Sequence, residues 1–227
     1  MSEPCWRVDL GRRGFNETLE LQRRLVLGRQ EGAIPDVLLL VEHPPTYTFG
    51  RSSRSEHLLA DTATLERLGA AVIETDRGGG ITFHGPGQIV GYPILDLSSW
   101  KRDVHEYLRS LEGLLIAAVR EQGIEAYREA GLTGVWHPSG KLAAIGVRVS
   151  RWVTSHGFAL NVSTDLEHYQ HIVPCGIFDR AVSSMENVLK APVALAPVRD
   201  AVSRSFARAF DRDVQEAPEA DLGVCSR

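Results

Sequence analysis

The chain has 227 residues, of which 43% are hydrophobic and 24% are charged, and its formal net charge is −4. This composition is typical of a soluble globular protein with a sizeable core, and the slight negative charge argues against nucleic acid as a partner. No apolar run approaches the roughly 18 residues of a membrane-spanning helix, and residues 1–13 lack the apolar segment of a signal peptide, so we expect no membrane association.

Short apolar runs, several of them alternating with polar residues, predict a series of strands. In chain order these expected strands are residues 5–11, 36–44, 46–50, 71–76, 88–97, 133–137, 141–150 and 152–162. Since strands follow one another in groups rather than in strict alternation with helices, we predict an α+β fold. Its sheet is expected to be mixed and largely antiparallel, packed with a few helices.

Capping residues and apolar stripes predict the helices, which are expected at residues 16–28, 61–69, 103–123 and 197–210. Asn16, Asp61 and Asp103 are expected to cap the first three helices. Gly123 is expected to stop the third, whose apolar stripe consists of Val104, Leu108, Leu111, Leu115 and Val119. We expect residues 1–217 to form a single domain and residues 218–227 to form a flexible tail.

The stretch RGGGITFHGPGQ, residues 77–88, holds five glycines beside basic residues, which is a pattern often seen around phosphates. A P-loop needs Lys and then Ser or Thr where Pro86 and Gly87 stand, and a dinucleotide loop needs its third glycine where Val90 stands. The residues that follow are typical of a strand, so a helix N-terminus for a phosphate is not expected. The glycines either let the backbone approach a ligand or another strand, or form tight turns.

Three cysteines, Cys5, Cys175 and Cys225, form no disulfide framework, and their odd number indicates a reduced, cytoplasmic protein. Cys175 lies between Pro174 and Gly176, so we expect it on a turn, where functional residues are common. A buried, inert cysteine is the alternative. No spacing of Cys and His suggests a metal site.

Lys141 begins the expected strand KLAAIGVRVS, on the same face as Ala143, Ile145, Val147 and Val149. A lysine in phase with an apolar face either extends past the strand end into solvent or lies near an anionic partner. A thiolate would be such a partner, because an ammonium group beside a cysteine lowers the pKa of the thiol.

Taken together, RGGGITFHGPGQIVGYPILDL, KLAAIGVRVS, HGFALNV and IVPCGI resemble the lipoyl(octanoyl) transferases of the biotin/lipoate protein ligase superfamily. The resemblance extends from Val37 to Leu189. It implies that the chain moves an octanoyl or lipoyl group from acyl carrier protein to a lysine of lipoyl domains. Such domains occur in 2-oxoacid dehydrogenase complexes and in the H protein of the glycine cleavage system.

The same resemblance implies that Cys175 is the nucleophile and that Lys141 activates it. Because a thioester donor already carries an activated acyl group, we expect that no cofactor is needed. We also expect the protein to be a monomer. It also implies the substrate-binding residues, which are Arg77, Gly78, Gly79, Gly80, Ile81, Thr82, Phe83, His84, Ala144, Ile145, Gly146, Gly157, Phe158 and Ala159. Among these, Phe83, Ile145 and Phe158 are expected to form an apolar wall.

Three alternatives stay open. His84, His156 and His171 lie in or beside the matching segments, so a catalytic pair of Cys175 and a histidine competes with Lys141. An ATP-dependent lipoate ligase on the same fold would need a nucleotide and no nucleophilic cysteine. A non-catalytic acyl-binding module would carry an inert Cys175.

Overall fold

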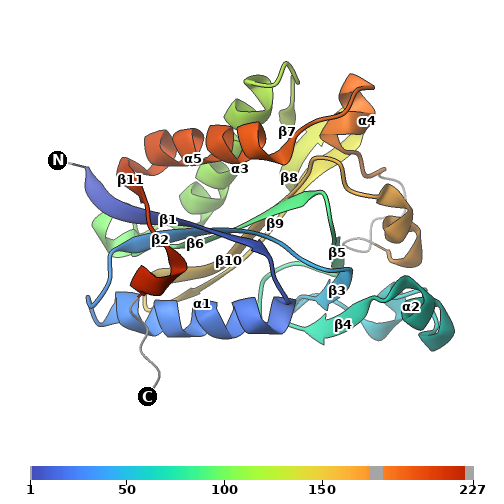
Figure 1. The fold of residues 1–227 in the computed structure, drawn as a ribbon, viewed down its shortest axis with the longest axis horizontal. Coiled ribbons are helices and arrows are strands. Elements are labelled where there is room, and N and C mark those ends of the chain that lie inside the picture. Colours follow the sequence, from blue (N-terminus) through green and yellow to red (C-terminus); the bar gives the residue numbers. More distant parts are fainter. Residues whose placement is uncertain (1, 174–180, 223–227) are drawn as a thin grey trace.

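The computed structural model describes residues 2–173 and 181–222, which form one eight-stranded sheet, one three-stranded sheet and the helices around them (Figure 1). The large sheet comprises β1 (Glu3–Arg12), β2 (Asp36–Glu42), β6 (Gln88–Ile94), β7 (Tyr127–Glu129), β8 (Leu132–His137), β9 (Gly140–Ser150), β10 (Val153–Asn161) and β11 (Arg212–Glu216). The small sheet comprises β3 (Thr46–Phe49), β4 (Ala71–Glu74) and β5 (Thr82–His84). The α-helices are α1 (Phe15–Gln30), α2 (Thr62–Leu68), α3 (Val104–Arg120), α4 (Met185–Leu189) and α5 (Leu195–Phe210). Short 3₁₀ helices are η1 (Ser55–His57), η2 (Leu97–Ser99), η3 (Leu166–His171) and η5 (Glu219–Leu222).

The strand order of the large sheet is β11-β1-β2-β6-β10-β9-β8-β7. β1 runs parallel to β2 and β11, and the other neighbours are antiparallel. Helices α3 and α5 cover one face of this sheet and α1 covers the other (Figure 1). The prediction of an α+β fold with a mixed, largely antiparallel sheet is confirmed.

Strand β2 lies between the two helical layers, which explains its apolar sequence. Leu38 and Leu40 belong to the core under α3 and α5, whereas Val37, Leu39 and Val41 belong to the core under α1. A strand that is buried on both faces has apolar residues in succession rather than in alternation.

Two of the three expected helix caps are present. The Asp61 carboxylate accepts a hydrogen bond from the Thr64 N–H (2.8 Å), and Asp103 accepts from the N–H groups of His105 (2.8 Å) and Glu106 (3.1 Å). The expected cap at Asn16 is wrong, because α1 already begins at Phe15. Gly14 precedes the helix, and its carbonyl accepts a hydrogen bond from the Thr18 N–H. Within the described residues, the helices are too short or too polar to span a membrane.

The sequence patterns missed β5, β7, β11 and α4, which have three to five residues each and no clear periodicity. Part of the segment expected as a flexible tail also packs against the domain, since Leu222 of η5 is buried in the core under α1. Arg13 holds this segment through a bidentate ion pair with Glu219 (2.7 and 2.9 Å).

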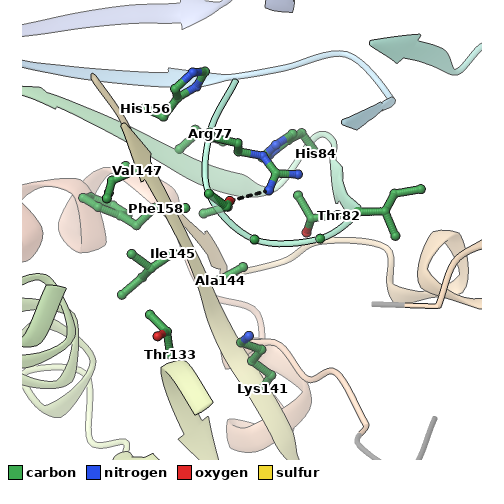
Figure 2. A pocket seen from close by; sticks show the side chains of 18 of the residues that line it. Arg77, Thr82, His84, Thr133, Lys141, Ala144, Ile145, Val147, His156 and Phe158 are labelled. Carbon is green, nitrogen blue, oxygen red and sulfur yellow. Dashed lines mark hydrogen bonds between the residues drawn. The ribbon is translucent and has the colours of Figure 1, made fainter. Parts of the chain in front are cut away.

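Strand β9 carries different side chains on its two faces (Figure 2). Ile145 and Val147 pack toward the core under α3, whereas Ala144 lies on the opposite side with its partner Ala159 of β10. The glycine stretch links β4 to β5 and then to β6 instead of opening a helix, which agrees with the sequence-based rejection of phosphate loops.

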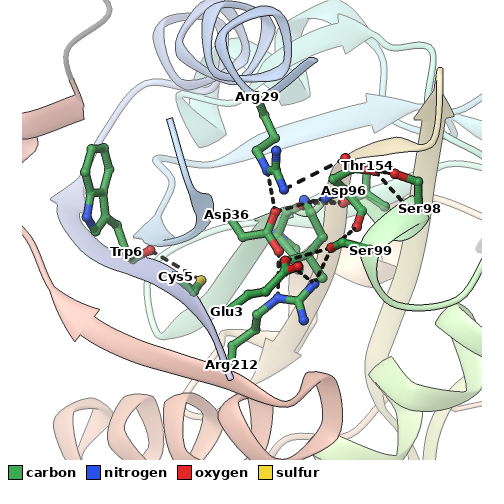
Figure 3. Close-up of polar contacts among 12 residues, drawn as sticks. Glu3, Cys5, Trp6, Arg29, Asp36, Asp96, Ser98, Ser99, Thr154 and Arg212 are labelled. Carbon is green, nitrogen blue, oxygen red and sulfur yellow. Dashed lines mark hydrogen bonds and ion pairs between the residues drawn. The ribbon is translucent and has the colours of Figure 1, made fainter. Parts of the chain in front are cut away.

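Near the β11 edge of the large sheet, a buried carboxylate joins elements that lie far apart in the sequence (Figure 3). Asp36 accepts hydrogen bonds from Arg29 of α1 (2.7 Å), Arg212 of β11 (2.7 Å) and the backbone N–H of Asp96 (3.0 Å). Cys5 lies in the same region, where burial and the neighbouring Asp36 raise the pKa of its thiol. Cys5 is therefore a structural cysteine.

We predict that Asp36→Asn lowers the free energy of unfolding by about 3 kcal/mol, because it leaves two arginines without their buried counter-charge. Urea unfolding at pH 7 measures this change. The control is Glu20→Gln, which removes an exposed ion pair with Arg23 and should cost less than about 0.5 kcal/mol. Equal losses in the two variants would contradict the structural role of Asp36.

Candidate functional site

A cavity of about 520 Å³ lies between the glycine stretch and strands β9 and β10 (Figure 2). Its size is within the range of small-molecule sites in proteins. Among the described residues that we expected in the site, all but Phe83 line it: Arg77, Gly78, Gly79, Gly80, Ile81, Thr82, His84, Lys141, Ala144, Ile145, Gly146, Gly157, Phe158 and Ala159.

The floor of the cavity consists of small residues in register on two neighbouring strands. Ala144 of β9 pairs with Ala159 of β10, and Gly146 pairs with Gly157. With no side chain larger than a methyl group at these four positions, space remains between the sheet and the glycine stretch above it. The floor is therefore suited to a slender apolar group.

The glycine stretch forms the roof and lies directly on β9. The Gly78 N–H donates to the Val147 carbonyl (2.9 Å), and a Cβ on Gly146 would lie only 2.8 Å from the Gly78 oxygen. Gly50 permits a second close approach, because a Cβ there would lie 2.3 Å from the Gly79 oxygen. The glycines thus let the backbone of this stretch approach a neighbouring strand closely, which is the first of the two interpretations given above.

Hydrogen bonds of Arg77 hold the start of the roof in place. Its buried guanidinium donates to the carbonyl (2.7 Å) and the hydroxyl (2.9 Å) of Thr48 and to the Gly78 carbonyl (3.1 Å). The preceding residue, Asp76, binds His156 Nε2 (2.8 Å) and Arg148 (3.0 Å). Although partial burial opposes ionisation, the hydrogen bond from His156 and the charge of Arg148 hold the pKa of Asp76 below its usual value.

His84 is a neutral structural histidine within a continuous hydrogen-bond chain. The Thr48 hydroxyl accepts from Arg77 and donates to His84 Nε2 (3.2 Å), and the His84 Nδ1–H donates to the Gln88 side-chain oxygen (2.9 Å). Burial, followed by the nearby His43 and Arg77, lowers the pKa of His84 well below its usual value. Both ring nitrogens are thus in use, so His84 is poorly suited to act as a base.

The other two histidines differ from His84. Burial lowers the pKa of His156, against the opposing hydrogen bond to Asp76, and within the described residues its Nδ1 has no hydrogen-bond partner. His156 also lines the cavity and has a positive φ of 55°, which is unusual for a residue with a side chain. His171 lies at the end of η3, where its carbonyl accepts from the Leu59 N–H (2.8 Å).

Aromatic rings close the cavity at the start of α1. Phe15 and Tyr92 line this end, and His43 lies behind them, 5.0 Å from the Phe15 ring and 5.9 Å from the Tyr92 ring. Phe15 and Tyr92 were not expected in the site: Phe15 lies outside the matching motifs, and Tyr92 lies in one of them but was not among the expected binding residues. His156 was expected only as a competing base. Phe83 instead stacks on His168 (4.2 Å) in the core of the small sheet, outside the cavity lining.

Lys141 lines the cavity where β9 begins. Its Nζ lies 5.1 Å from the centre of the Trp136 ring, within cation–π range. Its backbone N–H donates to the Ala181 carbonyl (2.9 Å), and its own carbonyl accepts from the Ser183 N–H (3.0 Å). Cys175 lies outside the described residues, but the chain that follows residues 174–180 is hydrogen-bonded directly to Lys141.

We predict that His43 makes the protein less stable as the pH falls from 6.5 toward 4. Burial lowers its pKa to about 4, against the opposing hydrogen bond to the Arg13 carbonyl, so between these pH values the unfolded chain binds a proton that the folded chain does not. Between pH 7.5 and 5 the free energy of unfolding therefore falls by about 2 kcal/mol because of His43. In urea unfolding at both pH values, His43→Gln should lose less stability than the wild type; equal losses would contradict this role.

Comparison with known proteins identifies the family. The model of the lipoyl protein ligase A/B catalytic domain matches residues 15–207. The chain is 52% identical over 220 residues to an octanoyltransferase of Solibacter usitatus, covering 97% of this chain and 98% of that protein. It is 45% identical over 222 residues to an octanoyltransferase of Gloeobacter violaceus, covering 97% of each chain.

Solved structures share the fold at low sequence identity. A lipoate-protein ligase A bound with ATP superposes with a TM-score of 0.73 at 17% identity, covering 98% of this chain and 92% of that chain. A bipartite lipoate protein ligase of Thermoplasma acidophilum, determined with its E2 lipoyl domain, superposes with a TM-score of 0.75 at 18% identity, covering 96% and 90%. The chain therefore belongs to the lipoyl protein ligase A/B catalytic-domain family and, within it, to the octanoyltransferases, which are transferase enzymes.

Proposed function

We propose that this enzyme transfers an octanoyl group from acyl carrier protein to a lysine of lipoyl domains through a thioester on Cys175. The observation that carries the proposal is the cavity itself, which has four small residues on its floor and Lys141 in its lining. The acceptors would be the lipoyl domains of 2-oxoacid dehydrogenase complexes and the glycine cleavage H protein. We also propose that the enzyme acts as a cytoplasmic monomer without a cofactor.

The lining of the cavity supports an acyl chain as its occupant. Ala144, Gly146 and Ala159 would lie below the chain, the glycine stretch above it, and Phe15 and Tyr92 at its end. An apolar chain that enters such a site is removed from water, which stabilises the complex by about 0.8 kcal/mol for each buried methylene group.

Two observations support the pairing of Lys141 with Cys175. Ala181 and Ser183, which follow residues 174–180, are hydrogen-bonded to the backbone of Lys141. Gly140 lets this segment lie close to β9, since a Cβ on Gly140 would lie 2.6 Å from the Ala181 oxygen. An ammonium group near a thiol favours the thiolate, which is the nucleophilic form. The Pro-Cys-Gly sequence and the resemblance to octanoyltransferases support Cys175 as the nucleophile.

The proposed reaction proceeds in two acyl transfers. The Cys175 thiolate attacks the octanoyl carbonyl carbon, the bond to the carrier sulfur breaks, and the Lys141 ammonium gives that sulfur a proton. The amine of the acceptor lysine then attacks the Cys175 thioester and forms an amide. The Cys175 thiolate leaves, and neutral Lys141 takes the proton that the attacking amine releases. Both residues thereby return to their starting charges.

We predict that incubation with octanoyl carrier protein, without ATP, adds one octanoyl group to the protein and that apo lipoyl domain removes it. Intact-mass spectrometry measures both steps. Cys175→Ser should lose nearly all transfer because it removes the nucleophile, whereas Cys5→Ser and Cys225→Ser should stay active. Product that forms only with ATP and magnesium would indicate a ligase, and octanoate bound without covalent attachment or transfer would indicate a binding module.

We predict that Lys141→Ala raises the pKa of Cys175 toward the ordinary thiol value of about 8.5. The rate of Cys175 alkylation by iodoacetamide against pH measures this shift. Lys141→Arg keeps the charge but cannot give up a proton, so it should keep much of the thiolate and still impair transfer. If Lys141→Ala leaves the alkylation profile unchanged, the base must be sought among the histidines, and His156 comes first because its Nδ1 has no partner within the described residues.

A further inference from the structure

A buried carboxylate on α3 connects to the backbone beside Lys141. Glu112 is fully buried, and its Oε2 accepts from Arg109 (2.7 Å) and pairs with the Arg128 Nε (3.2 Å). Its Oε1 accepts from the backbone N–H of Gly134 in β8 (3.0 Å). The two arginines balance the negative charge of Glu112 at Oε2, while Oε1 fixes the peptide N–H of Gly134.

Gly134 lies against the side chain of Lys141. A Cβ on Gly134 would lie 2.5 Å from the Lys141 Cε, 3.2 Å from its Nζ and 2.6 Å from the Ala143 oxygen. Gly134 also has a φ of +134°, which residues with side chains rarely adopt. The aliphatic part of the Lys141 side chain therefore packs directly on the backbone of Gly134 in β8. The Lys141 amine faces the Trp136 ring.

The pairing of β8 with β9 is irregular at this point, which explains why a side chain holds the backbone. The register shifts between Val135 and Trp136, next to Gly134. At such a shift the regular ladder is interrupted, and a peptide group needs another partner. Glu112 supplies that partner from a helix of the neighbouring layer.

We infer that Glu112 is a positioning residue for Lys141: it fixes the Gly134 backbone, and the Gly134 backbone fixes where the Lys141 amine lies. The role of this amine in acyl transfer rests on the proposed function. Because misplacing a proton-transfer group by about 1 Å can lower a rate by up to about 100-fold, a carboxylate without contact to the substrate can still control turnover.

The chain offers a matched control in Asp36. Like Glu112, Asp36 is fully buried, binds two arginines and accepts from one backbone N–H, but it lies at the opposite part of the sheet, next to β1 and β11. Glu112→Gln and Asp36→Asn therefore make the same chemical change. Only the first change affects the backbone beside Lys141.

The experiment measures the reactivity of Lys141 directly. The chain has three lysines, Lys101, Lys141 and Lys190, so competitive acetylation followed by peptide mass spectrometry yields the rate of Lys141 relative to Lys190 across the pH range. It is carried out on the full-length wild type, Glu112→Gln and Asp36→Asn, under conditions where urea unfolding shows that each is folded. Single-turnover transfer and KM are measured on the same samples.

We expect Glu112→Gln to change the relative labelling of Lys141 by about threefold or more and to shift its pH profile, because the amine becomes more mobile. We also expect it to lower the transfer rate about tenfold with little change in KM. Asp36→Asn should leave both the labelling profile and the rate close to those of the wild type.

Equal labelling profiles and equal transfer rates in the two variants would overturn the inference. If Glu112→Gln does not fold, Gly134→Ala replaces it, with Gly123→Ala as its control, since both glycines have positive φ but a Cβ on Gly123 would meet no atom within 4 Å. A wild type that transfers no octanoyl group would contradict the proposed function instead, and the labelling of Lys141 would still test its positioning.

Discussion

The site depends on one close contact between two backbones, where the glycine stretch lies on strand β9. The Gly78 N–H binds the Val147 carbonyl, and Gly146 lies so close to Gly78 that even a methyl group would collide with it. This contact holds the stretch over the sheet as a roof, and the small pairs Ala144–Ala159 and Gly146–Gly157 leave the space below it open. A larger residue in the floor would fill that space or displace the roof.

Hydrogen bonds among polar groups in and behind the lining keep this apolar cavity in shape. One hydrogen-bond chain runs through Arg77, Thr48, His84 and Gln88, and its histidine is neutral. A separate hydrogen bond joins His43 Nε2 to the Tyr92 hydroxyl (2.8 Å). Because these groups are satisfied by one another, they need no polar partner inside the cavity. At the end of the cavity where we propose the reaction, the Lys141 side chain packs on the Gly134 backbone and its amine faces the Trp136 ring.

Much of the fold was predictable from the sequence because its signals are local. Asp61 and Asp103 cap helices through contacts two or three residues away, and β2 is apolar because helices cover both its faces. β11 was missed because its place depends on Arg212 and Asp36, which are 176 residues apart. Phe83 was expected in the wall, yet the alternation of β5 directs Thr82 and His84 toward the cavity and Phe83 away from it.

If the proposed function is correct, the space under the glycine stretch holds the acyl chain. The most direct measurement delivers an octanoyl analogue with a diazirine at its terminal carbon as the carrier thioester, followed by irradiation and peptide mapping. We expect crosslinks to the end and floor of the cavity, in peptides that contain Phe15, Tyr92 or residues 144–159. Crosslinks concentrated in the groove around Arg109 and Arg128, or spread over the protein surface, would contradict this placement of the acyl chain.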